Sequence, residues 1–243
     1  MQSKIFENNE ANYLNTNLPE VCGHTFFSPP LNDTSVIIDL GGSTAGFSRT
    51  LVSRYGCFCH VVEATSVNIG KIQETERIRK YHYAVSNKNL PVKLHLADEY
   101  YHWGSINPDL GFKSKGMEEV QGITLERFLN KIGCLEPDLV KVDIEGAEFE
   151  MFESSDDKLI TGIGQFTVEF HDFIDISLSS KVERILARLK SLGFICIVFT
   201  RKFHGDVLCI NPNRVLLNPI LEFNIRHIKK NMRGLSRIIN RIL

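Results

Sequence analysis

The stretch VIIDLGGSTAGF, from Val36 to Phe47, is the feature that most constrains how this chain can fold. Its first five residues are mostly β-branched and apolar and predict a short buried strand, and the glycines after them predict a tight turn. A helix is expected next, over about residues 46–55. A strand that passes through a glycine turn into a helix offers backbone N–H groups and the positive end of the helix to a ligand. The stretch therefore predicts an α/β domain with a ligand at this turn.

The rest of the chain repeats the alternation of strands and helices. Further strands are predicted at 57–63, 81–86, 91–96, 138–143, 164–170, 194–199 and 206–210, and helices at 66–79, 124–132, from about 146, and 180–192. Such alternation indicates parallel strands joined by crossover helices on both faces of one sheet, and the last two strands predict an antiparallel hairpin at its edge. We expect one domain over residues 36–212, an N-terminal arm over 1–35 and a C-terminal tail over 213–243.

Composition excludes several classes of protein. A formal net charge of −1 gives no reason to expect a nucleic-acid partner, and the six cysteines show neither metal-site spacing nor a disulfide framework. No apolar leader or membrane-length run is present, which predicts a cytoplasmic protein. The tail from residue 214 carries seven Lys and Arg against one Glu, and its apolar residues recur at helical spacing. It predicts a basic amphipathic helix that contacts a membrane surface, an acidic partner or its own domain.

The glycine turn itself rules out two ligands. Gly46 is not followed by Lys, so the turn is not a nucleoside-triphosphate loop, and glycines at 41, 42 and 46 do not fit the G-x-G-x-x-G dinucleotide pattern. An acid at the end of the strand, Asp39, disfavours a pyrophosphate and suits the α-ammonium of S-adenosylmethionine, unless it only caps the turn. Glu63 ends the next strand 22 residues beyond Gly41, where an acid can accept ribose hydroxyls, unless it has a surface role. Together the two acids favour S-adenosylmethionine.

Several segments resemble the FkbM-type methyltransferases, which use S-adenosylmethionine. They are VIIDLGGSTAGFS, HVVEA, YHYAVSNKN, TLERFLNKIGCLEPDLVKVDIEGAEFEMF and the EFH that follows the fifth predicted strand. The resemblance implies a class I methyltransferase fold, a doubly wound Rossmann-like sheet of about seven strands whose last strand is antiparallel. The cofactor-binding residues that we expect on this basis are Asp39, Gly41, Gly42, Ser43, Gly46, Phe47, Glu63, Ala64, Ala84, Val85 and Asp143. The turn is one residue longer than is usual in the family, since seven positions separate Asp39 from Gly46.

Three polar residues are expected at the carboxyl ends of the strands, where ligands of open parallel sheets bind. His171 titrates near neutrality and is the candidate general base. Asp143 is expected to position the methyl donor or the acceptor, and Glu145 to bind a sugar hydroxyl, although both can also cap the helix that follows. Lys141, unusual within a strand, is expected to pair with a carboxylate. A divalent cation held by Asp143, Glu145, His171 and Asp172 is the less favoured alternative, and no metal is expected.

These residues and the resemblance predict an S-adenosylmethionine-dependent O-methyltransferase. The resemblance alone implies the acceptor, a hydroxyl of a glycan, a sugar or a related small natural product. Two alternatives stay open: a non-catalytic cofactor-binding or partner-recruiting module, and a methyltransferase of the same fold that acts on a macromolecule. DNA is disfavoured as a substrate, because Asp143-Ile144-Glu145-Gly146 stands where amino-methylating DNA enzymes carry an Asn/Asp-Pro-Pro-aromatic motif.

Overall fold

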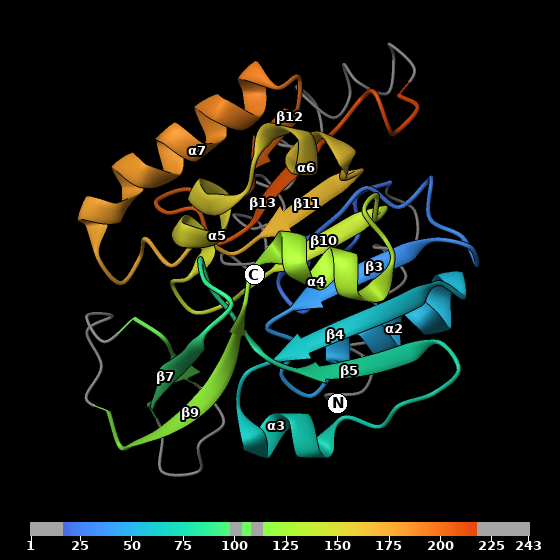
Figure 1. The fold of residues 1–243 in the computed structure, drawn as a ribbon. Coiled ribbons are helices and arrows are strands. Elements are labelled where there is room, and N and C mark those ends of the chain that lie inside the picture. The colour runs from blue at the N-terminus through green and yellow to red at the C-terminus, as the bar shows by residue number, and fades with distance from the viewer. Residues whose placement is uncertain (1–16, 98–103, 108–113, 218–243) are drawn as a thin grey trace, which may run out of the picture.

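The computed structural model describes residues 17–97, 104–107 and 114–217 of the chain. A seven-stranded sheet in the order β12-β13-β11-β10-β3-β4-β5 forms its centre (Figure 1). The strands are β3 (Val36–Leu40), β4 (Phe58–Glu63), β5 (Ile78–His82), β10 (Leu139–Val142), β11 (Gln165–Val168), β12 (Ile195–Val198) and β13 (Val207–Ile210). In this sheet β13 alone runs antiparallel to its neighbours. The predicted class I methyltransferase sheet, with its antiparallel last strand, is confirmed.

The helices connect these strands. They are α2 (Gly46–Tyr55), α3 (Ser66–Lys71), α4 (Leu125–Ile132), α5 (Glu148–Ser154), α6 (Asp157–Gly162) and α7 (Ser179–Ser191), with a short 3-10 helix η1 (Ile176–Leu178) before α7. Thr124 caps α4 as predicted, because its side chain accepts a hydrogen bond from the Arg127 N–H. The predicted helix over 66–79 was wrong beyond Lys71. Residues from Ile78 onward pair with β4 instead, so sheet hydrogen bonds override the local helical composition there.

The two faces of the sheet are covered differently. Alternate side chains of a strand point to opposite faces. Ile38, Val140 and Phe166 pack in one apolar cluster with residues of α4, α5 and α7, whereas Ile37, Cys59 and Val61 pack in another with residues of α2. The position of the functional side chains follows from this alternation, because Asp39 and Lys141 share a register with Val61 and so lie on the α2 face.

Residues 17–35, which we expected to be part of an N-terminal arm, are packed against the sheet. The strands β1 (Glu20–Val21) and β2 (His24–Thr25) pair as a hairpin, which we call the N-terminal hairpin (residues 18–27). Leu18 and Phe27 are buried with residues of β12 and β13, and Phe26 packs beside α2. The Thr25 hydroxyl donates to Asp206 Oδ2 over 2.7 Å. The N-terminal hairpin thus covers the half of the α2 face that lies over the closing strands.

A second, smaller sheet lies beyond the carboxyl ends of the central strands. It contains β6 (Ala84–Val85), β7 (Pro91–Leu96), β8 (Gly104–Ser105) and β9 (Gly116–Ile123) in the order β6-β9-β7-β8. β7 was predicted, and β9, its antiparallel partner, was not. In Figure 1, β7 and β9 project to the lower left of the central sheet.

The predicted basic tail falls almost wholly outside the described residues, since the description ends at residue 217. Across the parts of the chain that are described, no helix is both long and apolar enough to cross a membrane.

Replacing Gln165 with Leu should destabilise the protein by about 2 kcal/mol or more. The buried Gln165 amide accepts a hydrogen bond from the Phe27 N–H and donates to the Phe27 carbonyl, both over 2.9 Å. A leucine leaves two buried backbone groups without these partners, and each such loss costs about 1–3 kcal/mol. Gln121→Leu is the matched control, because its amide also bonds to backbone groups but the residue is exposed. Urea unfolding measures both variants, and an equal loss in the two would contradict the prediction.

Candidate active site

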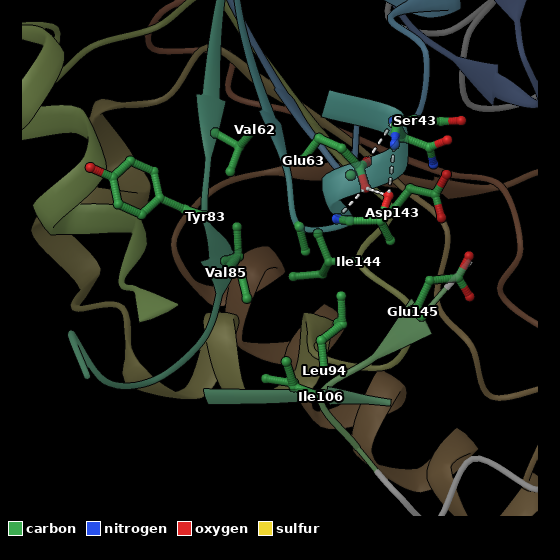
Figure 2. Close-up of a pocket in the computed structure, with 16 residues that line it drawn as sticks. Ser43, Val62, Glu63, Tyr83, Val85, Leu94, Ile106, Asp143, Ile144 and Glu145 are labelled. Atoms are coloured by element: carbon green, nitrogen blue, oxygen red, sulfur yellow. Dashed lines mark hydrogen bonds between the residues drawn. The ribbon is translucent and has the colours of Figure 1, made fainter. Parts of the chain in front are cut away.

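A cavity opens where β3, β4 and β10 end (Figure 2). It is lined by Gly41, Ser43, Val62, Glu63, Ala64, Thr65, Asn68, Tyr83, Ala84, Val85, Leu94, Gly104, Ile106, Asp143, Ile144 and Glu145. The central sheet supplies one side of the cavity and the small sheet the other. The cavity therefore has an apolar side and a row of acids along its rim, which suits a ligand with both apolar and polar parts.

Glu63 lies at the end of β4 and is only 6% exposed. Its Oε1 accepts hydrogen bonds from the Thr65 N–H and the Thr65 hydroxyl, and its Oε2 accepts one from the Ser43 N–H over 2.8 Å. Burial raises the pKa of this carboxyl above its ordinary value, although the hydrogen bonds oppose that rise. Since a carboxylate oxygen accepts about two hydrogen bonds, Oε2 retains capacity for a donor from a ligand.

The longer glycine turn is accommodated by two left-handed residues that are not glycine. Ser43 has φ 48° and Ala45 has φ 62°, a conformation that costs a residue with a side chain free energy of order 1–3 kcal/mol. Gly41, in contrast, is required sterically, because a Cβ there would lie 1.6 Å from the Asp143 carbonyl oxygen. Backbone strain of this kind clusters at ligand sites. The turn is thus held tightly against the end of β10. Its Gly41 and Gly42 N–H groups donate to the Val62 carbonyl, and its Ser43 N–H donates to Glu63.

Asp39 does not line the cavity, and it is fully buried. Its Oδ2 accepts a hydrogen bond from the Ser48 hydroxyl over 2.7 Å, and its Oδ1 lies 3.4 Å from Lys141 Nζ. The predicted contact between Asp39 and the cofactor's ammonium stays a prediction; in the structure the cation that Asp39 faces is Lys141. Gly42, Gly46 and Phe47 also lie off the cavity lining.

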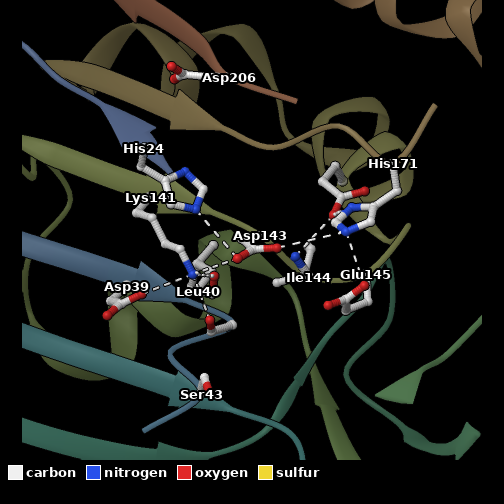
Figure 3. Close-up of polar contacts among 12 residues, drawn as sticks. His24, Asp39, Leu40, Ser43, Lys141, Asp143, Ile144, Glu145, His171 and Asp206 are labelled. Carbon is white, nitrogen blue, oxygen red and sulfur yellow. Dashed lines mark hydrogen bonds and ion pairs between the residues drawn. The ribbon is translucent and has the colours of Figure 1, made fainter. Parts of the chain in front are cut away.

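Lys141 joins the two acids that end β3 and β10 (Figure 3). Its Nζ lies 3.2 Å from Asp143 Oδ2 and donates to the Gly41 carbonyl over 2.6 Å. Burial lowers the pKa of this ammonium, but the charges of Asp39 and Asp143 outweigh burial and raise it. For Asp143 the balance is the reverse: burial raises its pKa, and Lys141 and His24 hold it well below its usual range. The expected pairing of Lys141 with a carboxylate is confirmed.

His24 reaches the site from the N-terminal hairpin. Its Nε2 lies 3.4 Å from Asp143 Oδ2, and its ring packs edge-on against Phe47. The residue is fully buried, and its Nδ1 has no hydrogen-bond partner among the described residues. No local pattern in the sequence predicts this contact, because 119 residues separate His24 from Asp143.

His171 lies between carboxylates on both sides (Figure 3). Its Nδ1 donates to Glu148 Oε1 over 2.9 Å, and its Nε2 lies 3.0 Å from Glu145 Oε2 and 3.9 Å from Asp143 Oδ1. Burial lowers the pKa of His171, but the Glu148 charge and the hydrogen bonds to Glu145 and Glu148 outweigh it and raise the pKa to about 11. In this arrangement His171 is a proton donor. Its predicted role as a general base requires the ring to lose that proton first.

Comparison with known proteins identifies the family. Residues 39–196, more than half of the chain, match the methyltransferase FkbM domain. The chain belongs to the FkbM methyltransferase family. Members of this family depend on S-adenosylmethionine. No curated protein matches the chain.

Three solved structures that are similar to this FkbM chain are distant from it in sequence. Methyltransferase FkbM from Methylobacillus flagellatus KT has 14% identity and a TM-score of 0.47, over 76% of this chain and 46% of that one. Precorrin-6y C5,15-methyltransferase from Geobacter metallireducens GS-15 has 14% identity and a TM-score of 0.41, over 74% and 80%. M. capricolum TrmK, in complex with S-adenosyl-homocysteine, has 13% identity and a TM-score of 0.39, over 88% and 84%. This chain thus spans less than half the length of the Methylobacillus protein.

Eight of the site residues expected from the sequence line the cavity of this FkbM domain: Gly41, Ser43, Glu63, Ala64, Ala84, Val85, Asp143 and Glu145. His171 is brought against Asp143 and Glu145 just outside that lining. Asp172, named in the alternative metal set, lies apart. Its carboxylate instead accepts hydrogen bonds from the His204 ring and backbone and from the Ser179 hydroxyl.

Other lining residues of the FkbM domain had not been expected. Tyr83, Leu94 and Ile106 come from β7 or from segments beside the small sheet, and Thr65 and Asn68 come from the start of α3. The alternation of apolar and polar residues in 91–96 predicted β7, which carries Leu94, but did not predict that this strand lies against the cavity.

Proposed function

We propose that this chain is an S-adenosylmethionine-dependent O-methyltransferase that acts on a hydroxyl of a sugar, a glycan or a related small natural product. The observation that carries the proposal is that one cavity is lined both by Glu63, after the glycine turn, and by the acids Asp143 and Glu145. Membership of the FkbM family supplies the reaction class and the methyl donor.

The proposed cofactor site uses the part of the cavity nearest Glu63. The remaining capacity of Glu63 Oε2 suits a ribose hydroxyl, and the apolar side chains of Val62, Ala84 and Val85 suit an adenine ring. The Gly41–Ser43 turn then lies beside the methionine part of the cofactor. The carboxylates near this part of the cavity carry more negative charge than Lys141 neutralises, and this excess favours the positive sulfonium.

The proposed acceptor lies at the Asp143–Glu145 end of the cavity. In the reaction, the acceptor oxygen forms a bond to the methyl carbon, the carbon–sulfur bond breaks with its electrons kept by sulfur, and the hydroxyl proton passes to the Glu145 carboxylate. Carboxylates that accept a hydrogen bond from the hydroxyl orient its oxygen toward the methyl group, and such positioning is a large part of catalysis. His171 contributes by holding the Glu145 carboxylate in place.

A screen for methyl transfer tests this function. Purified protein is incubated with S-adenosylmethionine labelled in the methyl group and with nucleotide sugars, oligosaccharides, hydroxylated small molecules, amines and RNA. Label is expected on a hydroxyl of a sugar-like or small acceptor. Transfer only to amines or RNA, or binding of the cofactor without transfer to any acceptor in the panel, would argue against the proposal.

His171→Ala should lower turnover by about 100-fold and change cofactor affinity less than threefold, because His171 touches Asp143 and Glu145 but lies off the cavity lining. Methyl-transfer kinetics and calorimetry measure the two quantities. His204→Ala is the matched control, since His204 also lies between two carboxylates, Asp172 and Glu183, and should leave turnover unchanged. A His171 variant with full turnover would remove this residue from the mechanism.

A further inference from the structure

The side chains at the Asp143 end of the cavity form a group with the chemistry of a metal site. Asp143, Glu145 and His171 each offer one ligand atom, and these atoms all lie within 4.8 Å of one another. The three come from the segments that follow β10 and β11, so two neighbouring strands bring them together. We propose that Asp143, Glu145 and His171 bind one divalent cation, of the Mn²⁺ type, beside the methyl-transfer cavity; this inference rests on the proposed function for its catalytic role.

The distances from His171 to the two carboxylates of the group fit a coordination shell. Ligands held at 2.0–2.1 Å in octahedral geometry lie about 3 Å apart when adjacent and about 4 Å apart when opposite. His171 Nε2 lies 3.0 Å from Glu145 Oε2 and 3.9 Å from Asp143 Oδ1. An ion between them takes the place of the proton that His171 otherwise shares with Glu145. Two carboxylates with one imidazole suit Mn²⁺, which accepts both oxygen and nitrogen ligands.

Nδ1 of His171 already makes the hydrogen bond that is typical of a histidine bound to a metal. A histidine that binds a metal through one nitrogen donates the N–H of the other to a carboxylate or carbonyl, which fixes the ring. His171 Nδ1 donates to Glu148 Oε1 over 2.9 Å, and Glu148 is fully buried. The same oxygen accepts from the Ile144 and Gly146 N–H groups, so the backbone fixes the carboxylate in turn. Glu148 is thus a positioning residue for the proposed ion.

Two buried polar atoms around the cluster lack partners among the described residues. They are Glu148 Oε2 and His24 Nδ1, both in fully buried residues that contact His171 or Asp143. Buried carboxylates are normally paired or coordinate a metal. With Lys141 positively charged and with His171 neutral once the ion replaces its proton, the four carboxylates of the cluster (Asp39, Asp143, Glu145 and Glu148) leave three negative charges in excess. A dication reduces that excess to one.

The backbone at Glu145 is strained in a way that presents its carboxylate to the cluster. Glu145 has φ 53° and Gly146 has φ 94°, and the Glu145 carbonyl accepts a hydrogen bond from the Ser105 hydroxyl. Left-handed residues with side chains persist where surrounding contacts hold them, and they gather at ligand sites. Here they keep the Glu145 side chain beside His171 while leaving it 23% exposed to the cavity.

A second group, His24, Asp143 and Glu169, shares Asp143 with the first. We favour the group with His171, because Nδ1 of His24 has no described partner to fix its ring, whereas Nδ1 of His171 is held by Glu148. An ion held by Asp143, Glu145 and His171 would supply polarisation of the acceptor hydroxyl. With Glu145 bound to the ion, the Glu169 carboxylate beside the cluster would take the hydroxyl proton in its place.

Mn²⁺ titration of the full chain, stripped with EDTA, tests the site by the electron paramagnetic resonance signal of free Mn²⁺. One ion per chain is expected, with nitrogen modulation of the bound signal from a single imidazole. Glu145→Gln and His171→Asn should each weaken binding at least tenfold, and His171→Asn should abolish the nitrogen modulation. Glu148→Gln should weaken binding by 10-fold or more as a positioning residue. Glu183→Gln is the control, because Glu183 contacts His204 and not His171, and it should leave Mn²⁺ binding unchanged.

Absence of stoichiometric binding, with and without S-adenosylmethionine, would overturn the site, as would binding that survives Glu145→Gln and His171→Asn but is lost in His24→Gln. Circular dichroism confirms that each variant is folded. Full methyl transfer in excess EDTA would overturn the cation's catalytic role and leave the proposed function standing. Stoichiometric Mn²⁺ binding that follows the variant pattern supports the site whether or not an acceptor has been found.

Discussion

Replacing Glu63 with Gln should lower the affinity for S-adenosylmethionine by at least about 100-fold, which is about 2.8 kcal/mol of binding free energy. The carboxylate accepts the Thr65 and Ser43 N–H groups, and in our proposal it also accepts a ribose hydroxyl. In the variant an amide NH₂ group replaces one of the two carboxylate oxygens. It then faces the N–H group of Ser43 or Thr65, and two donors cannot form a hydrogen bond. The variant therefore loses the cofactor contact and opens the turn that surrounds it. Calorimetric titration with the cofactor measures the loss directly.

Glu119→Gln is the matched control for this variant. Glu119 is an exposed residue of β9 and should leave the affinity unchanged. Cofactor affinity in Glu63→Gln within threefold of the unmodified protein, with the same thermal transition, would refute the proposed cofactor site. Asp39→Asn distinguishes the roles of Asp39 and Glu63, because Asp39 does not line the cavity. A large loss of cofactor affinity in this variant would mean that the charge of Asp39 acts on the cofactor.

Replacing Lys141 with Met should destabilise the protein by about 3–5 kcal/mol. Methionine keeps most of the side-chain volume and removes the charge that lies between Asp39 and Asp143. Removing one partner of a buried ion pair leaves the other charge without compensation, which is among the costliest single changes in a protein. Urea unfolding provides the measurement. Lys158→Met on the exposed side of α6 is the control and should fall within about 0.5 kcal/mol of the unmodified protein.

A double variant separates charge from packing. Asp39→Asn added to Lys141→Met removes one of the two uncompensated acids, so it should recover at least 1 kcal/mol of the loss. Residues in direct contact show coupling of this size, whereas distant ones add independently. Additive losses in the double variant would mean that the lysine acts through its packing alone, and the charge argument would fail.

The central sheet could be predicted from the sequence because its signals are local. Val36–Leu40 and Gly46–Tyr55 were predicted with the bounds that the structure has, since a buried strand, a glycine turn and an amphipathic helix each leave a short-range pattern. Glu63 was identified for the same reason: spacing alone places an acid at the end of a neighbouring parallel strand. The helix predicted to run on to residue 79 failed where β5 pairs with β4, a non-local event.

The electrostatics of the site could not be predicted in this way. Asp39 was assigned to the cofactor because nothing local indicates that Lys141 lies beside it. That contact depends on the pairing of β3 with β10, which aligns two residues about 100 positions apart. The pKa of His171 likewise depends on Glu148, which lies 23 residues away in the sequence. A sequence shows which groups can titrate, but their charge state depends on which ones the fold brings together.

The N-terminal hairpin also has a consequence for the order in which the protein folds. The hairpin leaves the ribosome before the groups that anchor it, Gln165 and Asp206, which are synthesised up to 181 residues later. Contacts of such long sequence separation close late, because the intervening chain must order before they form. His24 can therefore reach Asp143 only after β13 has been made and has joined the sheet. A nascent chain that still lacks β13 holds the glycine turn and Glu63 but not the finished charge cluster, so the Asp143 end of the cavity is assembled only after β13 has been made.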